Sequence, residues 1–148
     1  MNPYIEELEK VLESDPENVD ILIELASLYG EEDELRKASE LLEQAIAIDP
    51  ESAAAHYDLG VCYLKVVIED VSFSQMWEDR ADEEEFFELA TVAFQRALEI
   101  DPDLYEAHNN LGTLYALRGW NDQAKEHWEE SLQINPDQPD VREELGSL

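Results

Sequence analysis

The residues best suited to chemistry in this sequence are its histidines, its single cysteine and its many carboxylates. The three histidines, His56, His108 and His127, form no His-x-x-x-His pair, and the sequence has neither a cysteine cluster nor a glycine-rich phosphate loop. No serine stands in a nucleophile motif, and carboxylates are so numerous that a pair at any one spacing carries no information about acid–base catalysis. The sequence therefore predicts a protein that is not an enzyme, with no catalytic residues, no metal site and no cofactor.

Two further candidates for chemistry are an acidic run and the cysteine. The acidic residues at 78–79 and 82–85 could attract a divalent cation, but they lack the alternating Asp/Asn and the central Gly of a calcium loop. We interpret them as the solvated start of a helix. Cys62 can form no disulfide within the chain. Its apolar neighbours on a predicted helix favour a small buried residue over a reactive thiol.

The charge of the chain limits its partners. It carries 38 acidic and nine basic side chains, which gives a net charge of −29. Phosphate binding needs clustered Lys and Arg, so this charge argues against nucleic acid and against anionic membrane surfaces. It favours basic partners, mainly through their rate of association. The alternatives are a solvated acidic surface that keeps the protein soluble and an adaptation to high salt.

The N-terminal segment and the apolar runs bear on location. The sequence MNPYIEELEK has no basic region followed by an apolar run. No stretch approaches the ~20 apolar residues of a membrane span. We therefore expect no membrane insertion, and a soluble protein of a reducing compartment, the cytoplasm.

An internal repeat reveals the elements that position these residues. The segment 103–136 reads as two helices joined by a turn, and it ends in a dipeptide of Asp or Asn with Pro. The recurring dipeptides are Asp15-Pro16, Asp49-Pro50, Asp101-Pro102 and Asn135-Pro136. Their spacings are 34, 52 and 34 residues, and Tyr29, Tyr63 and Tyr115 repeat the spacings of 34 and 52. The unit is thus 34 residues long, and the middle copy has 18 additional residues (52 − 34).

These units resemble the repeats of tetratricopeptide-repeat (TPR) proteins. The Leu-Gly…Tyr core of that family's first helix is seen in Leu59-Gly60…Tyr63, in Leu111-Gly112…Tyr115 and, with Ala for Gly, in Leu25-Ala26…Tyr29. The second-helix pattern is seen in Ala38…Leu42…Ala45, Ala90…Phe94…Ala97 and Ala124…Trp128…Ser131. His56 and His108 stand where the family often has a large aromatic residue, so we interpret them, and His127, as packing residues. The resemblance implies an all-α, TPR-type right-handed helical-hairpin solenoid.

The repeat phase divides a single domain, residues 1–148, into five parts. They are a leading helix at 3–14, repeat one at 17–50, repeat two at 51–102, repeat three at 103–136 and a short closing helix at 137–148. Because the 18 inserted residues contain neither Gly nor Pro, we expect elongated helices in repeat two that project beyond their neighbours, with a junction in 69–82. Gly60 and Gly112 would each cost ~1 kcal/mol relative to Ala inside a helix, so they predict close helix packing.

In a solenoid of this kind the first helices line a concave groove, which is the family's usual binding surface. The repeat phase places these residues in the groove: Ile23, Ser27, Tyr57, Val61, Leu64, Asn109 and Thr113. TPR proteins that clamp the C-terminal carboxylate of Hsp70 or Hsp90 use Lys and Arg with Asn at matching places. Asn109 is present here, but the Lys and Arg are missing. We therefore expect an acidic groove that prefers a basic or apolar segment; the alternative is that these residues are merely exposed.

The insertion in repeat two provides a second candidate surface. Its large apolar side chains are Phe73, Met76, Trp77, Phe86 and Phe87. They either pack on one another at the helix tips or form a contact site for a partner or a second copy. We expect a protein–protein interaction module, a scaffold or co-chaperone-like adaptor that presents its groove to a peptide or helix. The alternative is a homo-oligomeric assembly protein that self-associates through exposed repeat ends or the insertion.

Overall fold

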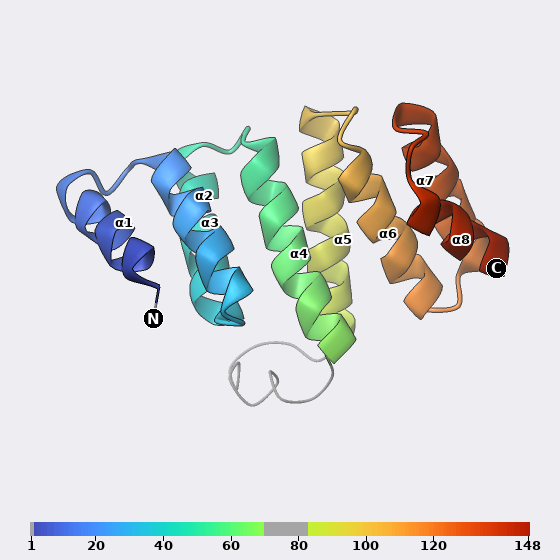
Figure 1. Ribbon diagram of the computed structural model, residues 1–148, viewed down its shortest axis with the longest axis horizontal. Helices are drawn as coiled ribbons and strands as arrows, with labels where there is room; N and C mark the ends of the chain where they lie inside the picture. The colour runs from blue at the N-terminus through green and yellow to red at the C-terminus, as the bar shows by residue number, and fades with distance from the viewer. Residues whose placement is uncertain (1, 70–82) are drawn as a thin grey trace.

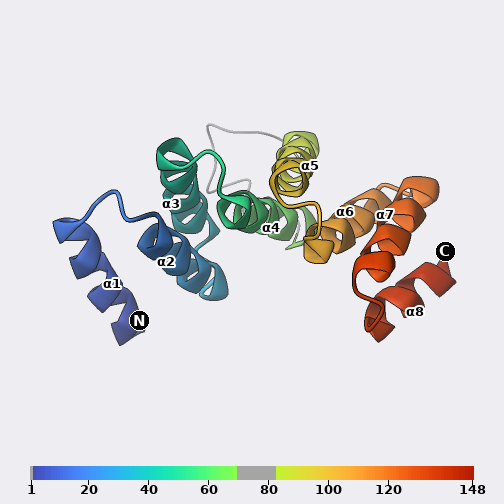
Figure 2. The ribbon, with the colours of Figure 1, turned by 90° about the horizontal axis from the view of Figure 1, so that it is seen from above.

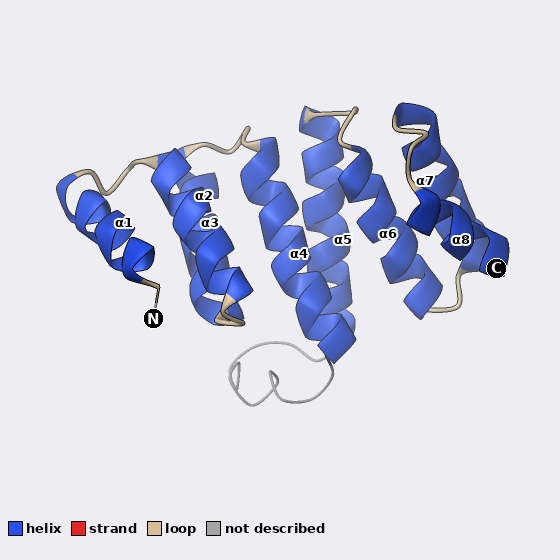
Figure 3. Ribbon diagram, in the orientation of Figure 1, coloured by secondary structure: helices blue, strands red, loops and turns tan. Residues whose placement is uncertain are grey.

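The computed structural model describes residues 2–69 and 83–148, and these residues form eight α-helices (Figures 1 and 3). The helices are α1 (Pro3–Ser14), α2 (Val19–Glu31), α3 (Leu35–Ile48), α4 (Ala53–Glu69), α5 (Glu83–Ile100), α6 (Tyr105–Leu117), α7 (Asn121–Ile134) and α8 (Pro139–Ser147). Neither described range contains a strand, so the predicted all-α class is confirmed. Of the helices in these ranges, none is both long and apolar enough to cross a membrane.

The helices pair into hairpins, in which α2 packs on α3, α4 on α5 and α6 on α7. Figure 1 shows the hairpins side by side in one row, with α1 and α8 at opposite ends. Seen from above in Figure 2, the row is curved, with α3 and α5 on its outer side and α2 and α4 towards its inner side. The arrangement is the predicted helical-hairpin solenoid.

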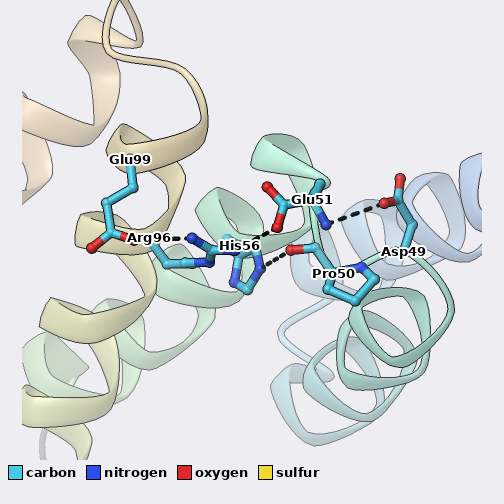
Figure 4. A network of polar contacts seen from close by, with 6 residues as sticks. All are labelled: Asp49, Pro50, Glu51, His56, Arg96 and Glu99. Atoms are coloured by element: carbon cyan, nitrogen blue, oxygen red, sulfur yellow. Dashed lines mark hydrogen bonds and ion pairs between the residues drawn. The ribbon is translucent and has the colours of Figure 1, made fainter.

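The same side-chain-capped turn recurs between hairpins. The Oδ1 atom of Asp49 accepts a hydrogen bond from the backbone N–H of Glu51 at 3.1 Å (Figure 4). Asp101 and Asn135 each bond the N–H two residues further on at the same distance of 3.1 Å. This bond satisfies a backbone donor just beyond the helix end, and the intervening Pro cannot continue the helix. The local chemistry explains why the dipeptide marks the repeat boundaries.

The second hairpin is longer than its neighbours. Helix α4 has 17 residues, whereas α2 and α6 each have 13. Helix α5 has 18 residues, whereas α3 and α7 each have 14. Each helix is therefore extended by four residues (17 − 13 and 18 − 14), or about one turn, and the prediction of elongated helices in repeat two is confirmed. Apart from Glu69, the predicted junction at 69–82 lies outside the described residues.

Two contiguous apolar clusters form the core, one over α1–α4 and one over α3–α6. Phe94 and Trp128 are buried where the helices of the second and third hairpins meet. A Cβ added to Gly60 would lie 2.7 Å from Phe94 Cε1, and one added to Gly112 would overlap the Trp128 indole. The prediction that these two glycines mark close helix packing is confirmed, because the aromatic rings occupy the space of the missing side chains.

Candidate binding groove

The residues predicted to line the groove come from the first helix of each hairpin. They are Ile23 and Ser27 on α2, Tyr57, Val61 and Leu64 on α4, and Asn109 and Thr113 on α6. Ser27 is exposed, and the others except Leu64 are partly buried. Leu64 is only 7% exposed and belongs to the apolar cluster that includes Phe86 and Leu111. It therefore offers little surface to a partner.

The face between α2 and α4 is hollowed into a pocket of about 190 Å³, called here the α2–α4 pocket. Its apolar wall includes Ala26, Leu35 and Val61, and its charged groups are Glu31, Asp58 and Lys65. Ser27 also lines it, so two of the predicted groove residues, Ser27 and Val61, meet in this pocket. The combination of an apolar wall with a few polar groups is typical of binding pockets.

Asp58 is a candidate functional residue that the sequence reasoning missed. Burial raises the pKa of its carboxyl from 3.8 to about 6. At neutral pH the group is still mostly ionised, so it is a partly buried anion that a nearby cation would stabilise. The signal was available in the repeat, because Asp58 follows Glu24 by 34 residues and precedes Asn110 by 52. The first helices of the three hairpins thus carry a polar residue at this place.

Two neighbours of Asp58 are already engaged in other ways. Lys65 Nζ donates to the carbonyl oxygen of Gly30 at 2.8 Å, at the C-terminal end of α2, where a cation is favourable. Cys62 is 6% exposed. Burial, and then the charge of Asp58, raise the pKa of its thiol to about 12. The thiol is therefore protonated and unreactive, and the prediction of a small buried cysteine is confirmed.

Tyr57 lies next to Asp58 on α4 in negative surroundings. Its ring centroid is 5.8 Å from that of Phe94, and its hydroxyl accepts a hydrogen bond from Asn110 Nδ2 at 3.2 Å. Burial raises the pKa of the Tyr57 hydroxyl; the bond from Asn110 opposes that shift, and the carboxylates of Glu106 and Asp58 add to it. The two carboxylates thus act on one aromatic side chain between α4 and α6.

Asn109 is occupied within the fold. Its Nδ2 donates to Gln138 Oε1 at 2.6 Å, and its Oδ1 accepts a hydrogen bond from the Ser131 hydroxyl. Its backbone carbonyl accepts a further bond from Trp128 Nε1 at 3.1 Å. These bonds join α6, α7 and α8. The amide that resembles part of a carboxylate clamp therefore serves the packing of the third hairpin.

The described part of the insertion packs into the core. Phe86 is 2% exposed and Phe87 is 5% exposed. The Phe86 ring lies 5.9 Å from that of Tyr63, and the Phe87 ring lies 5.7 Å from that of Trp120. Because neighbouring helices cover them, these two residues form no contact surface. The other predicted members, Phe73, Met76 and Trp77, lie outside the described residues.

His56 packs against a turn, in keeping with its interpretation as a packing residue. Its Nε2 lies 2.9 Å from the carbonyl oxygen of Pro50 (Figure 4). Beside it, Arg96 donates to Glu51 at 2.7 Å and to Glu99 at 3.0 Å. The network joins the α3–α4 turn to α5.

His108 and His127 come together between α6 and α7, with their Nδ1 atoms 3.1 Å apart. The sequence reasoning did not predict this pair. The residues are 19 positions apart, so they meet only because the hairpin folds α7 back onto α6. The spacing rules for ligand pairs within one helix do not find such a contact.

Comparisons with known proteins agree with this architecture. A family profile described as "TPR repeat" matches residues 28–66, and one described as "Tetratricopeptide repeat" matches residues 93–126. The protein "IFIT1 homolog B" of Homo sapiens is 26% identical over 123 residues, which cover 81% of this chain and 26% of that protein. The type IV pilus assembly protein PilF of Pseudomonas aeruginosa is 31% identical over 146 residues, which cover 95% of this chain and 50% of PilF.

A solved structure gives the same result. The crystal structure of MamA matches with a TM-score of 0.75 at 27% sequence identity, over 97% of this chain and 73% of MamA. The chain spans 26% of the IFIT1 homolog and 50% of PilF, so it corresponds to a part of each of these relatives.

Proposed function

The chain is a tetratricopeptide-repeat protein, and from that premise we propose that it is a non-enzymatic scaffold or co-chaperone-like adaptor whose inner face binds a basic segment of a partner protein. The observation that carries the proposal is Asp58, a partly buried carboxylate in the α2–α4 pocket whose pKa is raised to about 6. The family membership supports a role in protein–protein interaction. The pocket supports the chemistry of the partner.

A lysine or arginine side chain of the partner matches both parts of the pocket. Its methylene groups would lie against the apolar wall that Ala26 and Val61 form, while its charged head pairs with Asp58. A charge-assisted hydrogen bond to a carboxylate is about twice as strong as a neutral one. Asp58 has already lost part of its hydration in the free protein, so pairing adds little further desolvation on this side of the interface.

Long-range electrostatics acts in the same direction. The net charge of −29 attracts basic segments and raises their rate of association. The carboxylates of Glu106 and Asp58 near Tyr57 repel an acidic peptide. A partner that presents its C-terminal carboxylate to this face is therefore disfavoured.

The test uses fluorescent peptides that are apolar except for one central lysine, compared with the same peptides carrying norleucine at that position. We expect the lysine peptides to bind more tightly to the wild-type protein. Asp58→Asn should reduce their affinity about tenfold, which corresponds to about 1.4 kcal/mol. Norleucine peptides should be insensitive to the substitution, because they place no charge in the pocket.

Glu40→Gln is the matched control. It makes the same change of charge at an exposed residue on α3, which pairs with Arg36. We expect it to leave the binding of the lysine peptides nearly unchanged. If Asp58→Asn and Glu40→Gln weaken binding equally, the effect belongs to the overall charge and the pocket proposal fails.

A second candidate function is self-association through the ends of the row. Helix α8 contains no buried residue. At the other end, Tyr4 and Val11 of α1 are 43% and 41% exposed. Exposed apolar surface of this kind at the end of a repeat array can accept another helix.

A further inference from the structure

Two imidazoles and a carboxylate converge between α6 and α7. His108 Nδ1 lies 3.1 Å from His127 Nδ1 and 3.2 Å from Glu130 Oε2. One candidate ligand atom from each of the three residues lies within 4.8 Å of the other two. His127 and Glu130 are three residues apart on α7 and so share a helix face. Helix α6 presents His108 to that face.

This cluster has fewer protons than its lone pairs require. A neutral imidazole carries one N–H, and an ionised carboxylate carries none. If His108 Nδ1 bears the proton, it has two acceptors, His127 Nδ1 and the Glu130 carboxylate. If His127 Nδ1 bears it instead, the lone pair of His108 Nδ1 faces the Glu130 carboxylate directly. A metal ion would accept all three lone pairs and remove the conflict in both cases.

The surroundings favour the ligand forms of these side chains. Burial lowers the pKa of His108 and of His127, and the proximity of His108 lowers that of His127 further; the charge of Glu130 opposes both shifts. Both imidazoles are therefore neutral at neutral pH, which is the state that binds metal. The His108 side chain is 13% exposed and that of Glu130 is 46% exposed, so an ion can enter from the carboxylate side.

Aromatic stacking holds one of the imidazoles in place. The rings of Tyr115 and His127 are stacked, with centroids 5.4 Å apart and an interplanar angle of 22°. Trp120 stacks on Tyr115 in turn, at 6.0 Å. These contacts restrict the rotation of the His127 ring before an ion binds, which reduces the entropy lost on binding.

We propose that His108, His127 and Glu130 bind one divalent transition-metal ion of the Zn²⁺ type, which joins α6 to α7. With Zn–N and Zn–O bonds of about 2.0–2.1 Å, the ligand atoms of a tetrahedral site lie roughly 3.3 Å apart. The observed separations of 3.1 Å and 3.2 Å agree with that value. Two imidazoles favour Zn²⁺ over Mg²⁺ and Ca²⁺, which prefer oxygen ligands. Three protein ligands leave a fourth position for water or for a group from a partner.

Calorimetric titration of the full chain with Zn²⁺ in excess Mg²⁺ tests the proposal, because Mg²⁺ occupies the surface carboxylates without competing for imidazoles. We expect one Zn²⁺ per chain, a higher thermal midpoint with Zn²⁺, and the visible absorption bands of a tetrahedral site when Co²⁺ replaces it. Glu130→Gln and His127→Gln each remove a ligand. Since loss of an outer-shell contact alone reduces metal affinity by about 10–100-fold, each of these should reduce it by at least about 100-fold.

Three control variants should bind Zn²⁺ as the wild type does. Glu129→Gln makes the same change of charge at the neighbouring residue, His56→Gln removes the histidine at the equivalent place in repeat two, and Cys62→Ser removes the thiol. The proposal is overturned if Glu130→Gln retains wild-type affinity, if Glu129→Gln loses as much, or if no Zn²⁺ binds at one per chain. Glu130 is largely exposed, so its variant remains informative even where His127→Gln fails to fold.

Discussion

The Asp58 carboxyl makes the stability of the protein depend on pH at one residue. Its folded-state pKa of about 6 exceeds its ordinary value of 3.8, so the folded state retains a proton that the unfolded state releases. The stabilisation from this proton is present below about pH 4 and is lost as the pH rises through about 6. Asp58→Asn should therefore match the wild type at low pH and exceed its free energy of unfolding by about 1–2 kcal/mol near neutral pH.

Chemical denaturation of both proteins over this pH range measures the difference. Subtracting wild type from variant removes the contributions of the other carboxylates, which are common to the two chains. A difference that stays constant between low and neutral pH would contradict the raised pKa. The same titration lowers the affinity for a lysine-bearing segment as the pH falls through about 6, because the protonated carboxyl cannot pair with the ammonium group.

Gly60 and Gly112 reverse the usual effect of replacing glycine in a helix. Alanine normally stabilises a helix interior by about 1 kcal/mol relative to glycine. Here the new methyl group would meet the ring of Phe94 or Trp128, so Gly60→Ala and Gly112→Ala should lower the free energy of unfolding by about 1–3 kcal/mol. Chemical denaturation provides the measurement.

Gly30 is the internal control for this prediction. It lies within α2, and no heavy atom lies within 4 Å of an added Cβ. Gly30→Ala should be neutral or stabilising by up to about 1 kcal/mol. Destabilisation of similar size at all three glycines would show that the aromatic rings are not the cause.

At the scale of elements, Gln138 attaches the last helix to the array. It is 8% exposed; its Nε2 donates to the carbonyl oxygens of Ser131 at 3.1 Å and Asn135 at 2.7 Å, and its Oε1 accepts from Asn109. Gln138→Ala leaves these partners without their bonds. It should lower the free energy of unfolding by about 1–3 kcal/mol and increase amide hydrogen exchange in α8.

Asp137→Ala is the control for Gln138. Asp137 is exposed, and its backbone N–H rather than its side chain bonds to Asn135. Its substitution should leave both the stability and the exchange of α8 nearly unchanged. Equal protection of α8 in Gln138→Ala and in the wild type would mean that apolar contacts alone hold the helix.

The features that the sequence predicted are those with local causes. The turns after Asp49, Asp101 and Asn135 each depend on a bond that spans two residues, so the repeated dipeptide was enough to find them. The cause of the Gly60 and Gly112 positions, a facing aromatic residue, also recurs at fixed spacing within the repeat.

The features that it missed depend on how separate helices face one another. Burial of Asp58 requires α2 beside α4, and the pairing of His108 with His127 requires the hairpin to close. Leu64 was assigned to the groove from its repeat phase, but the elongated second hairpin buries it in the core. Gln138 belongs to no motif, and its role appears only where three helices meet.

At the scale of the whole molecule, charge opposes self-association. Copies that each carry a net charge of −29 repel one another, and added salt screens that repulsion within about 8–10 Å. We expect light scattering to report a monomer at low ionic strength, and any dimer formed through the exposed Tyr4 and Val11 of α1 to appear only at high salt. Val11→Asp should then abolish it. A concentration-dependent mass at low salt would contradict this expectation.

The separation of the two chain ends has a mechanical consequence. Because α1 and α8 lie at opposite ends of a single row (Figure 1), tension applied between the termini would pass through each hairpin in succession. Each hairpin is held mainly by its immediate neighbours. Stretching a single molecule would therefore open the row stepwise from an end, and each released hairpin would add its contour length while the remaining ones stay folded.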